Sequence, residues 1–309
     1  MTTDATASMA RRETLLPLLC LLATGALLGL TTFVAGSAIR QGWAPFAFLF
    51  WSALTSGVLL SVLALAAGER PRLSPHLLRY ALLSGLLSFA LPNLLSFAAI
   101  PHVGAGFVAL CLAFPPLVTY AMAVPLRMDR LTTRGVLGMA LGLVGAVFLA
   151  LSGTRSDDGG WLWIGLALAA PLVVSAGNIY RTVDWPGLAS PRLLAPLMLL
   201  AAALISGTVA VATGVPLQLP DAPVEIALLA AQTLVVAATY ALYFILQKLS
   251  GPVGLSQIGW IAAGTGKTLA VAFLGETVPL LLPPAFVLIL AGIIVLARRG
   301  KGAGADRRD

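Results

Sequence analysis

Long apolar runs alternate with short polar or charged connections along the chain. Each run is close to the roughly 20 residues that an α-helix needs to cross the hydrocarbon core of a bilayer. Glycine, proline and charged residues bound ten such runs. They cover residues 14–38, 43–67, 75–98, 101–125, 133–153, 161–182, 190–214, 222–248, 252–275 and 279–298. The pattern predicts an all-α integral membrane protein with ten transmembrane helices.

The boundary between the third and fourth runs is the weakest, because only Ile100, Pro101 and His102 separate them. Fusing these runs would give nine spans. Basic residues favour ten, because cytoplasmic connections of membrane proteins are enriched in Lys and Arg. With ten spans, both termini and 16 of the 19 Lys and Arg residues, Arg181 among them, fall on one side. Only Arg40 and Arg155 fall on the other.

Composition supports the membrane assignment and limits the partners. Hydrophobic residues make up 59 % of the 309 residues, charged residues make up 10 %, and ten spans leave no room for a nucleotide-hydrolysing domain. The net charge of +7 would suit nucleic acid in a soluble protein, but here it marks membrane sides, so no nucleic-acid partner is expected. Cys20 and Cys111 lie inside apolar runs and indicate no disulfide framework.

The two halves of the chain share a spacing of chemically similar residues. Asp129 follows the fourth run and Glu276 the ninth, and each is followed after 16 residues by a glycine, Gly145 or Gly292. These patterns predict two five-helix repeats, residues 1–155 and residues 156–309. An odd number of spans per half inserts the second half upside down, so the repeats are inverted and related by an axis in the membrane plane.

This organisation resembles the drug/metabolite transporter superfamily, EamA type. The shared features are the acidic residue after the fourth helix of each half and the Gly-containing fifth helix, although Asp129 replaces the more usual Glu and Ala285 replaces a Gly. The resemblance implies a central cavity lined by helices one to four and six to nine, with helices five and ten outside. Compact, basic bacterial members resemble exporters of amino acids and related metabolites.

Lys267 is the sharpest candidate for a functional residue. It lies within the ninth run, roughly 22 Å and 12 Å from the two ends at 1.5 Å per residue. A cation at the bilayer centre costs on the order of 2.5 to 3.5 kcal/mol, so Lys267 should face a polar cavity or a partner. We expect it to bind a substrate carboxylate or to titrate. The alternative is a lysine satisfied by backbone carbonyls at neighbouring kinks.

Other polar and aromatic residues at membrane depth complete the candidate substrate site. Their spacing puts one group on a single face of helix nine and a tyrosine pair on one side of helix eight. A zwitterion with an apolar or aromatic tail would suit them, with its ammonium on rings and amide oxygens and its carboxylate on Lys267. Singly, such residues also join helices or anchor interfaces. The candidates besides Lys267 are Gln257, Trp260, Gly264, Asn93, Tyr240, Tyr243, Asn178 and Trp163.

The sequence contains no Ser-His-Asp arrangement, metal-ligand spacing or paired carboxylates, so we expect no enzyme activity, cofactor or metal. None of the twelve acidic residues lies at mid-span, so a proton relay or sodium site has no obvious candidate. This favours facilitated diffusion, exchange, or coupling through Lys267.

The predicted function is a secondary transporter of the bacterial inner membrane, with both termini cytoplasmic, that exports aromatic or apolar amino acids by alternating access. Its expected partners are this small-molecule substrate and the lipid bilayer. The sequence leaves open uptake or exchange of other metabolites or drugs, a lipid scramblase and an integral membrane enzyme. It also leaves open a homodimer, the transport direction and the coupling ion.

Overall fold

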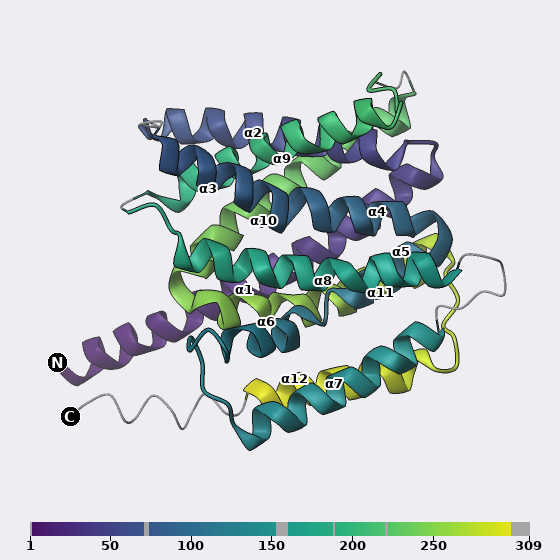
Figure 1. The fold of residues 1–309 in the computed structure, drawn as a ribbon. Coiled ribbons are helices and arrows are strands. Elements are labelled where there is room, and N and C mark those ends of the chain that lie inside the picture. The colour runs from purple at the N-terminus through teal and green to yellow at the C-terminus, as the bar shows by residue number, and fades with distance from the viewer. Residues whose placement is uncertain (1, 71–73, 153–159, 188, 220–221, 298–309) are drawn as a thin grey trace.

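The computed structural model describes residues 2–70, 74–152, 160–187, 189–219 and 222–297, and every regular element in these ranges is helical. Successive spans cross the molecule in opposite directions (Figure 1). The elements are α1 Thr2–Arg40, α2 Pro45–Ala66, α3 Pro75–Gly85, the π-helical turn η1 Leu86–Ala90, α4 Leu91–Val103, α5 Ala105–Cys111, α6 Pro115–Ala123, α7 Thr133–Ser152, α8 Gly160–Val183, α9 Pro191–Ala212, α10 Pro223–Ser256, α11 Ile258–Leu274 and α12 Leu282–Ala297.

Seven helical stretches of the described residues are long and apolar enough to cross a membrane. Three shorter apolar helices, Thr133–Leu149, Ile258–Leu274 and Leu282–Gly292, fall in the fifth, ninth and tenth predicted runs. Arg155, the predicted boundary between the repeats and the basic residues from Arg298 onward lie outside the described residues. The multi-span, all-helical character is therefore confirmed, while the count of ten remains a prediction.

The predicted break between the third and fourth runs is misplaced. α4 continues through Pro101 to Val103, and the chain turns at Gly104, whose φ of 85° lies in the region that favours glycine. Pro101 removes one helical N–H near the end of α4 but does not end the helix. Gly104, not Pro101, therefore sets the boundary between these spans.

Several spans are interrupted near the middle of the bundle. α3 and α4 are joined by the π-helical turn before Pro92, and residues 112–114 separate α5 from α6 at Pro115. In the second half, Gln257 separates α10 from α11, whereas Gly251 within α10 lies at the turn between the eighth and ninth predicted runs. Such interruptions free backbone groups, so they are tolerated in a membrane only where protein or water satisfies them.

Small residues let the helices approach closely. A Cβ on Gly29 of α1 would lie 2.6 Å from the carbonyl oxygen of Ala262 in α11. α7 and α12 lie together along one side of the bundle (Figure 1), where a Cβ on Gly292 would lie 2.6 Å from the Gly138 carbonyl oxygen. Gly138 and Gly145 thus pack helices, as small residues commonly do in membranes.

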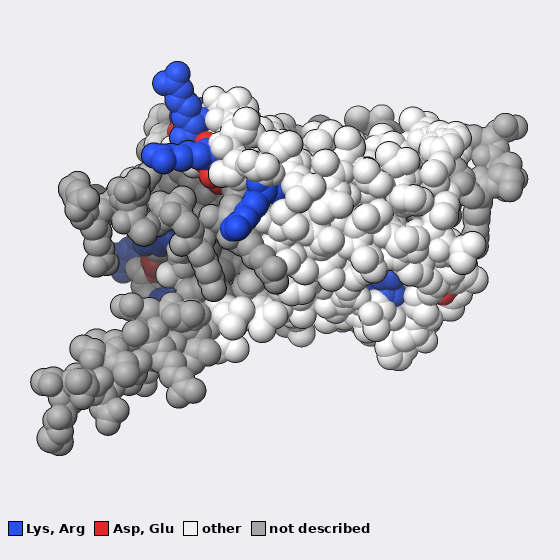
Figure 2. Space-filling model, turned by 90° about the horizontal axis from the view of Figure 1, so that it is seen from below, with Lys and Arg blue, Asp and Glu red and all other residues white. Residues whose placement is uncertain are grey.

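The outer surface of this helix pair is apolar. Leu143 and Val147 of α7 and Val287 of α12 are exposed. Figure 2 shows a broad uncharged surface on this side, with the charged groups gathered toward the two ends of the molecule. This distribution suits a protein surrounded by lipid along its middle.

The α7–α12 contact yields a test of the packing. Replacing Gly292 with Leu forces these helices apart, and overpacking costs about 1 to 3 kcal/mol. We expect Gly292→Leu to lower the unfolding temperature of the detergent-purified protein by roughly 2 to 10 °C. Gly165→Leu is the matched control, because a Cβ on Gly165 of α8 would meet no atom within 4 Å. Equal effects of the two variants would contradict the packing.

Candidate functional site

A small cavity of about 50 Å³ lies at the centre of the bundle, where the interrupted helices meet. Helices from both halves of the chain line it. Four of the predicted site residues do so, namely Asn93 of α4, Asn178 of α8, and Tyr240 and Tyr243 of α10. The cavity is far smaller than the roughly 300 to 1,000 Å³ of typical ligand pockets. The structure therefore brings these side chains together around a contracted centre.

Pro92 explains the polar character of one wall. Proline has no N–H, so the carbonyl of Ser88, four residues earlier, loses its usual helical donor. The Tyr240 hydroxyl donates to this carbonyl over 3.3 Å. The Asn93 Nδ2 group donates to the Phe89 carbonyl over 2.7 Å. One helix interruption thus places two of the predicted side chains at the cavity.

Asn178 and Tyr243 of the opposite wall contact a buried cation, Arg181, which the sequence pattern places in a cytoplasmic connection. Arg181 is fully buried near the end of α8, and its Nη2 group donates to the Asn178 Oδ1 atom over 2.8 Å. The Tyr243 hydroxyl donates to the same oxygen over 2.6 Å. The Arg181 guanidinium also lies 4.5 Å from the centre of the Tyr243 ring, a cation–π contact. The spacing of three puts Asn178 and Arg181 on one face of the helix, but spacing alone does not show that this face is buried.

Lys267 lies elsewhere, beside a cavity of about 430 Å³ at the end of the bundle that carries Arg40. Its Nζ group is 3.0 Å from Glu276 Oε2, and both side chains are nearly buried. Both carboxylate oxygens of Glu276 accept from the Gly106 amide over 3.1 Å. A Cβ on Gly106 would collide with this pair. Lys267 therefore faces a cavity and has a partner, as its position in an apolar run predicts, but this partner is the protein carboxylate of Glu276.

The predicted polar face of helix nine does not reach the central cavity. Gln257, Trp260 and Gly264 do not line it, whereas the neighbouring Ile258 and Gly259 do. The inner face of α11 consists of small residues such as Gly259 and Gly266, which pack against α5 and α1. The face of α11 that turns inward is thus the one with small residues, which allow close helix contact, and not the one with the polar residues. Trp163 also lies apart, stacked on His102 with ring centres 3.9 Å apart.

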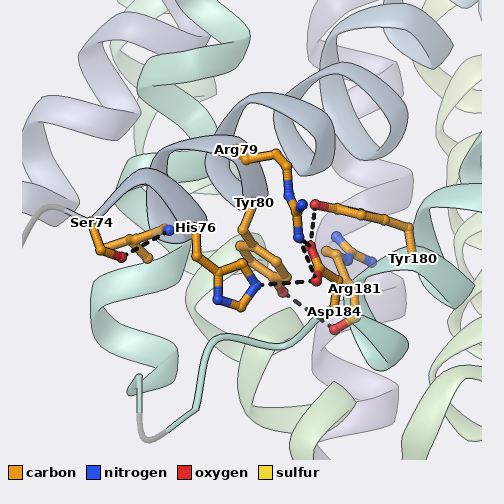
Figure 3. Close-up of polar contacts among 8 residues, drawn as sticks. Ser74, His76, Arg79, Tyr80, Tyr180, Arg181 and Asp184 are labelled. Atoms are coloured by element: carbon orange, nitrogen blue, oxygen red, sulfur yellow. Dashed lines mark hydrogen bonds and ion pairs between the residues drawn. The ribbon is translucent and has the colours of Figure 1, made fainter.

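The end of the bundle opposite Arg40 is tied shut by a cluster around Asp184, just after α8. Arg79 of α3 donates to both Asp184 carboxylate oxygens, over 3.0 and 3.1 Å, and His76 lies 3.1 Å from the same carboxylate (Figure 3). Tyr180 donates to Asp184 over 2.7 Å. We name His76, Arg79, Tyr180 and Asp184 the Asp184 cluster. It joins α3 to α8, which come from different halves of the chain.

Comparisons with known proteins agree with this architecture. Residues 15–151 match the EamA-like transporter family. This matched segment, 137 of the 309 residues, is similar to that family. A crystal structure of a protein 19 % identical in sequence has a similar fold, with a TM-score of 0.66 over 95 % of this chain and 99 % of that one. No curated protein matches the sequence. The family match implies a membrane transporter of small solutes, and the seven apolar helices indicate a multi-pass membrane protein.

A double-mutant cycle tests the Lys267–Glu276 pair. Removing one partner of a buried ion pair costs up to roughly 3 to 5 kcal/mol, because the other charge stays buried. We expect Lys267→Met to lower the unfolding temperature in detergent more than the double variant with Glu276→Gln does. Strictly additive losses would show that the pair does not interact.

Titration tests the Asp184 cluster. The hydrogen bond from Tyr180 is the main cause that holds the pKa of the Asp184 carboxyl below its ordinary value of 3.8, against an opposing effect of burial. Because this pKa is lowered on folding, ionised Asp184 stabilises the folded state at pH values above 3.8. This stabilisation is lost as the pH falls through the lowered pKa. In a His76→Gln background, Asp184→Asn should therefore reduce thermal stability equally at pH values of about 5 and 8. A stability loss that is smaller at a pH of about 5 than at a pH of about 8 would contradict the lowered pKa of Asp184.

Proposed function

We propose that this chain is a secondary transporter that exports aromatic or apolar amino acids by alternating access between two inverted five-helix halves. The observation that carries the proposal is the central cavity, which is lined by phenols and amides from both halves. Transporter sites commonly lie where discontinuous helices of two repeats meet. The proposed halves are residues 1–155 and 156–309.

Reciprocal contacts support the inverted repeat. A shift of 147 residues, which relates Asp129 to Glu276, also relates Gly138 to Ala285 and Gly145 to Gly292. A Cβ on Gly145 would contact the Ala285 carbonyl, and a Cβ on Gly292 would contact the Gly138 carbonyl. Each contact is the other with the halves exchanged, as a two-fold axis requires.

The contact of Leu112 with Gly259 supports an axis through the cavity. These residues are also 147 positions apart, and a Cβ on Gly259 would collide with the Leu112 carbonyl. A residue that meets its own counterpart lies near a two-fold axis. Both residues line the central cavity, so the proposed axis passes through the site.

Contacts at the two ends of the bundle support alternating access. The Asp184 cluster ties α3 to α8 at one end, while a cavity of about 430 Å³ hollows the other. The central cavity is too small for an amino acid in this conformation. A transport cycle therefore requires the helices around it to separate, and breaking the Asp184 cluster opens the end on which the basic connections lie. By the positive-inside rule that end is cytoplasmic, with both termini, in a bacterial inner membrane.

The lining favours an amphiphilic solute with a ring or an aliphatic tail. Phe89, Tyr240 and Tyr243 form a continuous aromatic group, with ring centres 5.2 and 5.5 Å apart in the two successive pairs. Ring faces attract an ammonium group, and amide oxygens accept its hydrogen bonds. Lys267 is neutralised by Glu276, so within this proposal it joins α11 to α5 rather than binding the substrate.

Uptake into proteoliposomes tests the proposed function. We expect saturable movement of labelled phenylalanine or leucine, with and without imposed proton or sodium gradients. Tyr243→Phe keeps the ring but removes the hydroxyl that donates to Asn178, and should lower kcat/KM by about 2- to 10-fold, the worth of one neutral hydrogen bond.

The control is Thr208→Val, because the Thr208 hydroxyl is exposed and donates within its own helix, α9. Its transport should equal that of the wild type. No movement of any amino acid under any gradient would refute the amino-acid substrate. Equal transport by Tyr243→Phe and Thr208→Val would refute the role of the central cavity.

A further inference from the structure

Arg181 is a buried cation without a counter-ion among the described residues. Its side chain has no exposed area, and no carboxylate of the described residues lies within 4.0 Å of its guanidinium nitrogens. Its contacts are the Asn178 amide oxygen, the Met198 sulfur at 3.7 Å and the rings of Tyr243 and Phe244. The Arg181 Nε atom has no hydrogen-bond partner. A buried charge of this kind is costly unless a ligand uses it.

The nearest carboxylate on the same helix end does not neutralise this charge. Asp184 is held by Arg79, His76 and Tyr180 in the Asp184 cluster (Figure 3). Glu276 belongs to the separate pair with Lys267. The positive potential of Arg181 therefore acts on the central cavity, since its neighbours Asn178 and Tyr243 both line that cavity.

Hydrogen-bond donors without partners face the same space. The Ser88 hydroxyl is buried, has no hydrogen-bond partner and belongs to a residue that lines the cavity. Asn178 uses its oxygen for both Arg181 and Tyr243, which leaves the two hydrogens of its Nδ2 group as donors. A hydroxyl and an amide N–H₂ beside an uncompensated cation are the groups that a carboxylate accepts from.

We propose that the central cavity recognises a carboxylate through Ser88 and Asn178, under the positive potential of Arg181, and that Lys267 is not the anion-binding residue. The inference rests on the proposed function and assigns its substrate class, solutes with a carboxylate group. The present cavity of about 50 Å³ is far smaller than the roughly 300 to 1,000 Å³ of typical ligand pockets, so it has room for a small polar group and not for a whole amino acid. The apolar remainder of the solute enters when the helices separate.

Binding to the purified full-length protein tests this assignment independently of transport. Calorimetric titration would compare 3-phenylpropanoate, phenylalanine and phenylalaninamide, which differ in their charged groups but share the ring. We expect both carboxylates to bind at least about 10-fold more tightly than the amide, as for hydrogen bonds to a charged group. Arg181→Gln should bring this ratio close to one.

Ser88→Ala is a second variant that tests the same site if Arg181→Gln does not fold. Removing an unpartnered buried hydroxyl should not destabilise the protein, but should lower the carboxylate preference by about 2- to 10-fold. Ser206→Ala is the matched control. Ser206 is fully buried in α9 and donates to the Ala202 carbonyl, away from the cavity. The carboxylate preference of Ser206→Ala should equal that of the wild type.

Equal binding of acids and amide by the wild type, or binding of neither, would overturn the inference. The inference would also be overturned if Lys267→Met lost the carboxylate preference while Arg181→Gln and Ser88→Ala kept it. Proteoliposome flux separates the two proposals. If phenylalanine is transported but acid and amide bind equally, the proposed function stands and the inference is rejected. If carboxylates bind selectively but no amino acid is transported, the inference stands and the proposed function is rejected.

Discussion

The cost of placing charged and polar groups in an apolar interior governs the organisation of this protein. A chain that is 59 % hydrophobic and surrounded by lipid has no water along most of its length to satisfy buried donors, acceptors or ions. Lys267 and Arg181 nevertheless lie inside the bundle, and their charges have different partners. Among the described residues, Lys267 has Glu276 as a direct partner, whereas Arg181 contacts an amide, a sulfur and aromatic rings. The first is a neutralised connection between helices, and the second leaves positive potential at the centre.

Backbone interruptions give the centre its polar groups. Pro92 frees the Ser88 carbonyl for Tyr240, Pro115 ends the turn after α5, and Gln257 separates α10 from α11. Pro92, Pro115 and the two neighbours of Gln257, Ser256 and Ile258, line one cavity. The glycine contacts between α7 and α12 hold the outer pair together without polar chemistry. The centre is thus polar where helices are interrupted, and the outer pair is apolar where its helices are continuous.

Periodicity and composition predicted most of the fold, because a bilayer imposes one length and one polarity on every spanning helix. The boundary between the third and fourth spans was misplaced, because the helix continues through Pro101 and ends at Gly104, which has a positive φ. For the site, Asn93, Asn178, Tyr240 and Tyr243 were predicted together and lie together.

Three aspects of the site could not be predicted from spacing alone. Lys267 pairs with an acid nine residues later, across the turn at Gly275, which a helical wheel does not show. The inner face of α11 is decided by how closely α1 and α5 approach, not by its polar residues. Arg181 was assigned to a loop because arginines at span ends usually face water, and only the packing of α8 against α10 buries it.

The central claim is that one cavity is reached in turn from both sides of the membrane. Ser96 lines that cavity, and the two native cysteines, Cys20 and Cys111, are buried. Ser96→Cys in a Cys20→Ala, Cys111→Ala background would therefore give a single thiol at the centre. A membrane-impermeant thiol reagent, applied to one face of oriented vesicles at a time, measures its accessibility. Alternating access predicts labelling from each face that a transported amino acid slows. Labelling from one face only, or labelling that no solute affects, would contradict the account.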